Sequence, residues 1–572
     1  MRIRVLLILF FFCFCGCSGG SSSKAPEGPV DDPLFPYQWH ISNTGQKAFS
    51  QSAGVKGEDL RMTQALAAGL SGQGVIIAVL DDSLEIAHED LKSNVIPGGS
   101  YNYLTGTTDP TSSMKKGEHG TSVAGIAAAV AMNGKGGRGV APQAFLKGFN
   151  VLEAQTGQNY IDSMGGHDRS KDVHIFNMSY GDDGLTYNPL GESARELYGS
   201  TAALRGGKGG IYVKSAGNGF HSASKQYVCT RESYGRWDLT CHNAAADEES
   251  GRPEVITVGA FNAWGVKSSY STAGSNLWVS APGGEYGTDS PAIITPDQSG
   301  CDKGYSRSRD LYIYPDSPAN DFDTGETGND GKYNPGCNYT SGFNGTSSAA
   351  PNASGAIALM LQTNPNLTRR DVKHILAKTA RKIDPESKPS IVTVDINGVN
   401  YQASEGWIKN KADYNFHNWY GFGAVHVDDA VAMAKTYNIT LPALQIKSYG
   451  GALSSAAEIP DNDAAGLTQT ITVPEADDLT IENLFVQISI DHPNTAETGI
   501  EITSPGGTRS ILLNIRSAVK TGLNPLGGGG VSFASNAFYG EKSKGTWTLK
   551  VLDSLLEKTG TLKHFGLRIL GY

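Results

Sequence analysis

The chain has 572 residues, which at about 150 residues per domain predicts two to four domains. Its 47 Lys and Arg residues against 57 Asp and Glu residues give a net charge of −10, which argues against a nucleic-acid binder held by a basic surface. Charged residues make up only 18% of the chain, glycines number 71, and 39% of residues are hydrophobic. This composition excludes wholesale disorder and predicts a loop-rich, exported globular protein.

The first 17 residues have the composition of a secretory signal. Arg2 and Arg4 precede an apolar run from Val5 to Phe14, which is typical of a signal segment and too short to span a membrane. The end of this segment also resembles a bacterial lipoprotein signal, in which Cys17 would carry the lipid and residues 18–30 would form a flexible linker. We therefore expect export from a bacterial cell, as an outer-membrane or cell-surface lipoprotein or, alternatively, as a periplasmic or secreted protein.

Four cysteines lie beyond the signal segment, and an even number in an oxidising compartment predicts disulfides. Three pairings are open. The shortest loops result when Cys229 pairs with Cys241 and Cys301 pairs with Cys337, and we expect this arrangement. No histidine joins them at zinc-finger spacing, so a cysteine-based metal site is not expected.

Between about residues 70 and 440, short apolar runs alternate with Ala-rich stretches of helical composition. Residues 75–80, 173–176 and 255–258 are predicted strands, and residues 121–132 and 349–362 are predicted helices. This alternation predicts an α/β fold with a mainly parallel sheet flanked by helices. Functional residues of such folds lie at the carboxyl ends of the strands.

The pattern changes after Asn438, where segments such as 479–488 and 545–551 alternate apolar and polar residues between glycine-rich turns. This pattern predicts an all-β sandwich or jelly roll. We therefore expect an α/β domain over residues 31–440 and a β-sandwich over residues 441–572. The segment 282–342 is rich in Gly, Asp and Pro and is poorly periodic. This composition predicts an extended surface insertion.

Three motifs place polar side chains at predicted strand or helix ends. Asp81 ends a strand, His119 opens a helix within His119-Gly120-Thr121, and Ser347 opens another helix within Gly345-Thr346-Ser347-Ser348. A serine hydroxyl becomes a good nucleophile when an imidazole takes its proton and a buried carboxylate holds that imidazole in one tautomer. The motifs, in this order, resemble those of subtilisin-fold serine proteases and more closely those of the kexin/furin proprotein convertases.

This resemblance implies a serine endopeptidase in which Asp81 orients His119, His119 acts as general base and then as acid, and Ser347 is the nucleophile. Ser348 has the same residue type, but the family pattern Gly-Thr-Ser-x-Ala-x-Pro selects Ser347. Asn218, in Ala216-Gly217-Asn218-Gly219, matches the family's oxyanion-hole residue, and the backbone N–H of Ser347 would be its partner. Each motif alone also fits a structural loop, cap or turn; all four in family order favour catalysis.

The resemblance also implies cleavage after basic residues. Ser179-Tyr180-Gly181-Asp182 borders the pocket for the residue before the scissile bond in convertases, so Ser179 and Gly181 would line this pocket and Asp182 would pair with Lys or Arg. Asp82 matches a carboxylate that faces the next substrate residue upstream. The alternative is that Asp182 lies in a solvated acidic turn.

A structural calcium ion is the implied cofactor. The side chains of Asp32, Asp90 and Asn133 match the family's tight calcium site, which carbonyl oxygens would complete. These carbonyl oxygens belong to Val130, Lys135 and Gly137. The family's second calcium site uses a Glu where this chain has Thr272, which leaves that site unsupported.

Residues 31–40 resemble the start of the mature convertase domain and lie so close to Cys17 that we expect no N-terminal folding segment. Folding help would then come from a separate chaperone-like protein, and the insertion over 282–342 would dock it or shape the cleft. Residues 441–572 resemble the convertase P domain, which covers and stabilises the catalytic domain. The alternative is a free-standing sandwich that binds carbohydrate or protein.

The predicted function is therefore an exported, calcium-stabilised, monomeric serine endopeptidase. Its partners would be protein or peptide substrates and a folding chaperone, with no nucleic acid and with membrane contact only through a lipid anchor. An alternative is a catalytically idle, protease-like surface protein whose cleft binds partners. A lipase-like esterase is disfavoured, because the chain lacks a Gly-x-Ser-x-Gly elbow and the order Ser-Asp-His.

Overall fold

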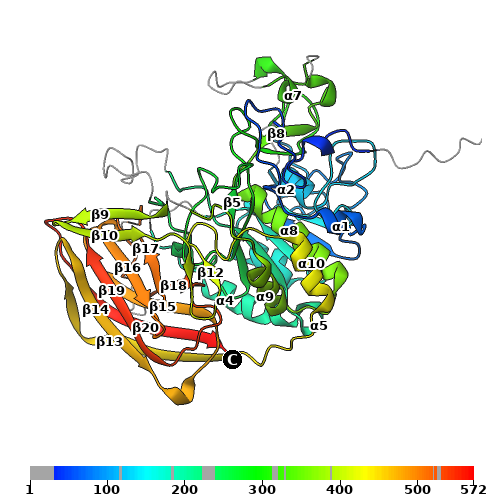
Figure 1. The fold of residues 1–572 in the computed structure, drawn as a ribbon. Helices are drawn as coiled ribbons and strands as arrows, with labels where there is room; N and C mark the ends of the chain where they lie inside the picture. Colours follow the sequence, from blue (N-terminus) through cyan, green and yellow to red (C-terminus); the bar gives the residue numbers. More distant parts are fainter. Residues whose placement is uncertain are drawn as a thin grey trace, which may run out of the picture.

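The computed structural model describes residues 31–114, 119–181, 186–221, 239–311, 320–326, 330–386, 390–519, 521–524 and 530–572. It consists of an α/β part and a β-sandwich, which is drawn in orange and red in Figure 1. Both classes of fold were predicted from the sequence, and both are confirmed. The predicted signal and linker, including Cys17, lie outside the described residues.

A six-stranded parallel sheet forms the centre of the α/β part, in the strand order β2-β1-β3-β4-β5-β6. These strands are β1 (Ile76–Leu80), β2 (Phe145–Phe149), β3 (Ile175–Met178), β4 (Ile211–Ser215), β5 (Val255–Phe261) and β6 (Val279–Pro282). Nearly all their residues are buried, because parallel strands are covered on both faces. Their carboxyl ends all lie at one edge of the sheet.

Helices pack on both faces of this sheet (Figure 1). The helices of the α/β part are α1 (Thr63–Ala67), α2 (His119–Ala128), α3 (Gly157–Ile161), α4 (Glu192–Ser200), α5 (Leu204–Gly207), α7 (Asp321–Thr324), α8 (Thr346–Thr363), α9 (Arg369–Thr379) and α10 (Val427–Thr436). Helix α9 begins with a capping box, in which Thr368 and Asp371 satisfy each other's backbone N–H groups. Helices α2 and α8 pack against each other and are almost wholly buried.

The segment 282–342 begins and ends in buried strands. β7 (Ile293–Pro296) pairs antiparallel with β8 (Tyr339–Phe343) and packs against α2. The part between these strands carries α7 and the Cys301–Cys337 disulfide, and it projects at the top of Figure 1. The ends of the segment are therefore part of the core rather than an extended surface loop, because β7 and most of β8 are buried.

Two short hairpins lie between α9 and α10 in the chain and contact the sandwich. They are formed by β9 (Val392–Ile396) with β10 (Val399–Ser404) and by β11 (Ile408–Lys409) with β12 (Asn415–Phe416). Buried and exposed residues alternate along β9, and its buried residues pack against Leu552 of the sandwich. The first hairpin therefore belongs to the packing of the sandwich.

Two four-stranded antiparallel sheets form the sandwich, in the orders β13-β20-β15-β18 and β14-β19-β16-β17. The strands are β13 (Gln445–Ile459), β14 (Asp463–Val473), β15 (Ile481–Asp491), β16 (Thr498–Thr503), β17 (Arg509–Leu513), β18 (Val531–Ser535), β19 (Gly545–Asp553) and β20 (Gly560–Gly571). Trp547 is fully buried between the sheets, where its indole N–H donates to the Ser543 carbonyl at 2.8 Å.

The sandwich packs against the α/β part through buried polar groups. The Asn536 Nδ2 group donates to the carbonyl oxygens of Asn276 at 2.7 Å and Leu277 at 3.2 Å. The Ser275 hydroxyl donates to the Ala534 carbonyl at 2.7 Å. Since unpaired buried polar groups are costly, these bonds fix the sandwich in one position.

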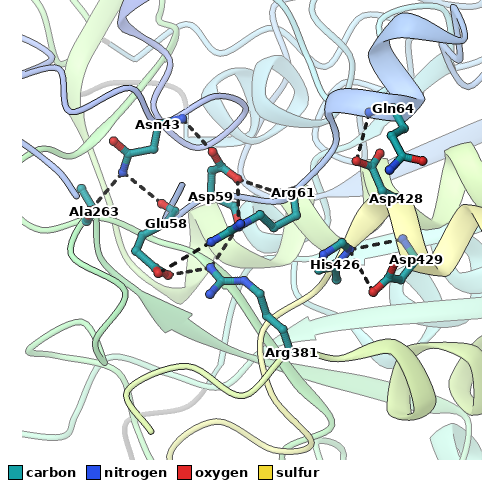
Figure 2. Close-up of polar contacts among 10 residues, drawn as sticks. All are labelled: Asn43, Glu58, Asp59, Arg61, Gln64, Ala263, Arg381, His426, Asp428 and Asp429. Atoms are coloured by element: carbon teal, nitrogen blue, oxygen red, sulfur yellow. Dashed lines mark hydrogen bonds and ion pairs between the residues drawn. The ribbon is translucent and has the colours of Figure 1, made fainter. Parts of the chain in front are cut away.

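The N-terminal segment is tied to the end of the α/β part by a second set of polar contacts (Figure 2). Glu58 forms an ion pair with Arg381 at 2.7 Å, and Asp59 accepts a hydrogen bond from the Asn43 backbone N–H at 2.8 Å. Asp428 of α10 accepts from two backbone N–H groups at the start of α1. These contacts hold together the first and last elements of the α/β part.

We predict that Asn536→Ala lowers the thermal unfolding midpoint of the whole chain. The change leaves the buried carbonyl oxygens of Asn276 and Leu277 without these donors, which costs about 1–3 kcal/mol. Thermal unfolding followed by circular dichroism measures the effect. Asn400→Ala, at an exposed position of β10, is the matched control and should leave the midpoint unchanged. Equal midpoints for the wild type and Asn536→Ala would contradict the prediction.

Candidate active site

Asp81 directly follows β1 at the carboxyl edge of the sheet, and its side chain is 1% exposed. Its Oδ1 atom accepts hydrogen bonds from His119 Nδ1 at 2.8 Å and from the Asp82 backbone N–H at 2.9 Å. Its Oδ2 atom is buried and has no partner among the described residues. Burial raises the pKa of Asp81, and the neighbouring His119 opposes this rise.

His119 is the first residue of α2, and Asp82 holds the start of this helix. The Asp82 carboxylate accepts hydrogen bonds from the backbone N–H of His119 at 3.3 Å and of Gly120 at 3.1 Å. A Cβ atom at Gly120 would lie 1.9 Å from the Ser83 carbonyl oxygen, so only glycine fits there. The structure thus gives Asp82 a capping role that the sequence did not indicate.

The His119 imidazole has a raised pKa. Burial alone would lower this pKa, but the Asp81 carboxylate and its hydrogen bond raise it more, and the Asp82 charge adds to the rise. The Asp81 hydrogen bond also fixes the proton on Nδ1, because the carboxylate can only accept there. The Nε2 atom of the neutral ring is therefore left as the basic atom.

Ser347 lies in the first turn of α8, and a reciprocal pair of hydrogen bonds fixes it to Ser179. The Ser347 hydroxyl donates to the Ser179 carbonyl at 3.2 Å, and the Ser179 hydroxyl donates to the Ser347 carbonyl at 2.9 Å. The Ser347 carbonyl does not receive the usual helical hydrogen bond from the backbone N–H four residues later, because residue 351 is proline. In this state the Ser347 hydroxyl bonds to Ser179 and not to His119.

The neighbouring Ser348 has a different environment. It is completely buried, and its hydroxyl contacts the carbonyl oxygens of Gly283 at 3.0 Å and Gly345 at 2.8 Å. Ser347 is 8% exposed. The structure therefore leaves Ser347 as the accessible serine of the pair, as the sequence pattern indicated.

Asn218 follows β4, and its orientation is set by α8. Its Oδ1 atom accepts from the backbone N–H of Thr346 at 2.9 Å and from the Thr346 hydroxyl at 3.0 Å, which leaves Nδ2 as a donor. A Cβ atom at Gly345 would lie 3.2 Å from Asn218 Nδ2 and 3.4 Å from the Ser347 backbone nitrogen. Two donors therefore face the same small space, and Gly345, with φ of 94°, keeps that space open.

The loop that carries Asn218 has its own support. The hydroxyl of Thr272 accepts from the Gly219 backbone N–H at 2.9 Å, and the Thr272 backbone N–H donates to the Gly217 carbonyl at 3.0 Å. Thr272 thus forms hydrogen bonds with the backbone on both sides of Asn218. This gives a structural role to the residue that replaces the family's second-site calcium ligand.

A cavity next to these groups is lined by Gly181 and by the backbone of residues 215–217. Gly181 was predicted to line the substrate pocket; Asp182 lies outside the described residues. Among the described residues, Asp247 supplies the carboxylate of this cavity. Sequence reasoning missed Asp247, because an acidic residue in an Asp-Glu-Glu run gives no sign that it turns inward.

Asp247 belongs to a buried charge cluster with Lys214 and Glu249. The Lys214 Nζ atom lies 3.0 Å from Glu249 and 3.7 Å from Asp247, and it donates to the Tyr180 carbonyl at 3.0 Å. Two carboxylates thus share one ammonium group, and Glu249 is the closer of the two. Burial is the main cause that raises the pKa of Asp247.

Two aromatic residues lie beside the candidate site: Tyr305 of the segment 282–342 and Phe343, which directly follows that segment. The Phe343 ring centre is 5.2 Å from that of His119 and 6.0 Å from that of Tyr305. Burial and then the charges of Asp82, Asp297 and Asp81 raise the pKa of Tyr305. The sequence placed this segment at the surface and gave no signal for either aromatic contact.

The predicted calcium ligands are brought to one region. Asp32 accepts hydrogen bonds from the backbone N–H groups of Met132 at 2.8 Å and Asn133 at 3.0 Å. Asp90 Oδ1 accepts from Asn133 Nδ2 at 2.8 Å, and the Asp90 carbonyl accepts from the Val130 N–H at 2.9 Å. Asn133 thus presents its nitrogen, rather than its oxygen, to Asp90.

Asp90 Oδ2 is buried and has no partner among the described residues. Burial raises the pKa of Asp90 to about 8; the hydrogen bond from Asn133 opposes this, and the charge of Asp32 adds to it. A Cβ atom at Gly136 would lie 2.4 Å from Asp90 Oδ2, so this glycine leaves space beside the oxygen. The nearby Lys135 ammonium group is engaged by Glu89 at 2.9 Å, and Gly137 also contacts Asp90. A buried carboxylate oxygen without a partner, close to the second carboxylate of Asp32, fits a calcium ion.

The disulfide between Cys301 and Cys337 is present, as the short-loop pairing predicted. Cys241 is also disulfide-bonded. Its expected partner, Cys229, lies outside the described residues.

Comparison with protein families identifies both parts of the chain. Residues 72–423 match the subtilase family, peptidase S8, and residues 481–569 match the proprotein convertase P-domain family. Among the described residues, no helix has the length and apolar composition needed to cross a bilayer.

Relatives span nearly the whole chain. The Aeromonas extracellular serine protease of Aeromonas sobria is 38% identical over 552 residues, which cover 92% of this chain and 85% of that protein. The microbial serine proteinase of Aeromonas salmonicida is 34% identical over 544 residues, with 90% and 83% covered. The human proprotein convertase subtilisin/kexin type 4 is 28% identical over 94% of this chain and 61% of that protein.

Solved structures agree with these matches. The structure of the Aeromonas sobria serine protease superposes with a TM-score of 0.84 at 34% identity, covering 97% of this chain and 99% of that one. The same protease in complex with its chaperone gives a TM-score of 0.85, with 97% of each chain covered. The chain therefore belongs to the subtilase family and is a serine endopeptidase with a proprotein convertase P domain.

Proposed function

We propose that the chain hydrolyses peptide bonds with Asp81, His119 and Ser347 as a catalytic triad. The observation that carries this proposal is the 2.8 Å hydrogen bond between Asp81 and His119, at the sheet edge where Ser347 also lies. His119 Nε2 takes the proton of the Ser347 hydroxyl as this oxygen attacks the scissile carbonyl, and it later gives the proton to the leaving amine. The hydroxyl must first leave its bond to Ser179, and such rearrangement on substrate binding is common.

Asn218 Nδ2 and the backbone N–H of Ser347 would stabilise the oxyanion that forms during this attack. Asn218 is held by Thr346, and the Ser347 N–H lies in the first turn of α8, where N–H groups lack helical partners. Both donors are in place before the reaction, so they need no reorganisation.

We propose a preference for Lys or Arg before the scissile bond. The support is the cavity beside Asn218, where Asp247 shares Lys214 with Glu249, so that one carboxylate charge is unmatched. A substrate cation would pair with this charge. Asp182 and Asp82 remain further candidates, the first as a second acid of the same pocket and the second for the next residue upstream.

A calcium ion would stabilise the fold at Asp32, Asp90 and Asn133. The support is the buried, unpartnered Asp90 Oδ2 atom and the space that Gly136 leaves beside it. When bound, the ion would place a divalent positive charge between the carboxylates of Asp32 and Asp90. It takes no part in the peptide-bond chemistry proposed here.

We further propose that the protein is exported and that a separate chaperone assists its folding. The A. sobria relative is named as an extracellular protease, and a structure of that relative contains its chaperone. Lipid attachment at Cys17 would keep the protein at the membrane. The competing function is that of a protein whose cleft binds partners without hydrolysing them. The Ser347→Ala test below separates this function from peptide hydrolysis.

Ser347→Ala is expected to reduce kcat for fluorogenic peptides about 10⁶-fold, because the nucleophile is lost. Ser348→Ala is the matched control and should retain hydrolysis, since its hydroxyl only contacts the carbonyl oxygens of Gly283 and Gly345. Initial rates on purified protein measure both effects. Hydrolysis that survives in Ser347→Ala, or that is lost only in Ser348→Ala, would contradict the assignment.

The pH dependence of kcat/KM reports the state of His119 in the free enzyme. Activity requires the neutral imidazole, so it should fall as pH drops through the raised pKa of His119. Asp82→Asn removes one charge that raises this pKa, so the acid limb of the pH profile should move to lower pH. An acid limb that stays at the same pH in Asp82→Asn would show that the Asp82 charge does not raise the pKa of His119.

Asp81→Asn should lower kcat by about 10⁴-fold, because the carboxylate no longer holds the His119 proton on Nδ1.

Added calcium should raise the unfolding midpoint of chelator-treated protein, because a ligand that binds only the folded state adds about 2.7 kcal/mol at 100 times its Kd. Asp90→Asn should abolish most of this response. Asp395→Asn, an exposed carboxylate on β9, is the control and should respond as the wild type does. A full calcium response in Asp90→Asn would place the ion elsewhere.

Asp247→Asn should lower kcat/KM about 10- to 100-fold for peptides cleaved after Arg, because a charge-assisted hydrogen bond contributes about 1.5–3 kcal/mol. Peptides cleaved after Phe should be affected far less. Glu249→Gln is the matched control, since Glu249 binds the same Lys214 but does not line the cavity. Equal losses for Arg and Phe peptides would show a structural rather than a selective role.

A further inference from the structure

A cavity of about 750 Å³ lies where the P domain meets the catalytic domain, and none of its lining residues belongs to the proposed triad. Its walls come from α4, α9 and the segment 252–254 on one side and from β13, β15 and β20 on the other. In Figure 1 these elements meet below the central sheet, near the C-terminus. Ligand sites in proteins have volumes of about 300–1,000 Å³ and occur preferentially between domains.

Cationic side chains dominate the polar wall of this cavity. Six cations line it, against four carboxylates: Arg195, Arg252, Arg369, Arg370, Lys373 and Arg568 against Glu192, Glu196, Glu254 and Glu482. Most of the cations are engaged: Arg370 binds Glu482, Arg252 binds Glu254 at 3.1 Å, and Arg195 binds Glu248 at 2.7 Å. Lys373 donates to the backbone carbonyl of Pro253 at 2.9 Å.

Arg568, from β20, differs from the other cations of the cavity. It is half-buried, and its guanidinium group forms no hydrogen bond or ion pair with the described residues; it lies 5.7 Å from the centre of the Phe485 ring. Burial lowers its pKa and the charge of Arg252 lowers it further, whereas the charges of Glu254 and Glu248 oppose this effect. Glu254 and Glu248 are engaged by Arg252 and Arg195, so the Arg568 guanidinium group is left without a direct hydrogen-bonded partner among the described residues.

The remaining wall is apolar. Ile446 is 52% exposed and Leu444 is 40% exposed, although both lie beside the buried Leu570 and Trp278. Exposed aliphatic side chains next to an unpaired guanidinium give the cavity one apolar side and one cationic side. A ligand that matches it has an anionic group attached to an apolar body.

We infer that this cavity is a binding site for a carboxylate carried on an aliphatic group, such as the C-terminal residue of a peptide. The carboxylate pairs with Arg568, and the aliphatic side chain packs on Leu444 and Ile446. The bound anion supplies the counter-charge that the Arg568 guanidinium group lacks. The site is separate from the proposed active site and does not depend on peptidase activity.

The experiment is isothermal titration calorimetry on the full-length protein with acetyl-Leu-Leu as the free acid, with its C-terminal amide and with inorganic phosphate, all at equal ionic strength. We expect saturable binding of the acid, at least tenfold weaker binding of the amide, and weaker binding of phosphate, which lacks the aliphatic part. Loss of a hydrogen bond to a charged group corresponds to about tenfold or more in Kd.

Arg568→Gln should weaken binding of the acid about tenfold, and Arg568→Lys should restore part of it. Lys563→Gln is the matched control, because it removes one positive charge from the same strand where Lys563 pairs with the surface residue Asp491. Hydrolysis of a fluorogenic peptide at the wild-type rate verifies that each variant is folded. Absence of saturable binding, equal Kd values for acid and amide, tighter binding of phosphate than of the acid, or unchanged affinity in Arg568→Gln would each overturn the inference.

Discussion

The shared carboxyl edge of β1, β3 and β4 is the constraint on which the candidate site depends. These three strands are neighbours in the sheet and run parallel, so the residues that follow them leave the sheet side by side. Asp81 and Ser179 follow β1 and β3, and Asn218 lies shortly after β4. Helix α8 is fixed at the same edge by paired hydrogen bonds between Ser179 and Ser347 and by the bonds from Thr346 to Asn218. The site is thus a consequence of the sheet's topology, which brings distant segments of the chain together.

A second theme is the position of buried carboxylates that lack a full counter-charge. Asp81 and Asp90 are buried and Asp247 is half-buried, and burial raises the pKa of each. Each lies where the proposed function brings a cation: the imidazolium of His119, a calcium ion and the side chain of the substrate. Because a lone buried charge is costly, such positions reduce the stability of the empty protein and increase the gain when the partner binds. The P domain differs from this pattern, since the group without a direct counter-charge at its junction with the catalytic domain is a cation, Arg568.

The sequence predicted the fold class and the main candidate residues because their signals are local. The apolar run 255–258 reflects a strand that is buried on both faces, and the alternation over 545–551 reflects a strand that is buried on one face. Both strands are present at these positions, as β5 and β19. The motif around Ser347 includes Pro351, whose missing N–H explains why the Ser347 carbonyl is free to bind Ser179. The capping role of Asp82, the inward turn of Asp247 and the aromatic contact of Phe343 with His119 could not be predicted. Each depends on a partner that lies far along the chain, and residue type alone does not encode such contacts.

The most direct test of the central claim is labelling by a fluorophosphonate probe, followed by peptide mapping. The triad predicts a single modified serine at position 347, with labelling lost in Ser347→Ala and strongly slowed in His119→Ala, because the hydroxyl reacts only when the imidazole takes its proton. Labelling of a different serine, or equal labelling rates in the wild type and His119→Ala, would contradict the account.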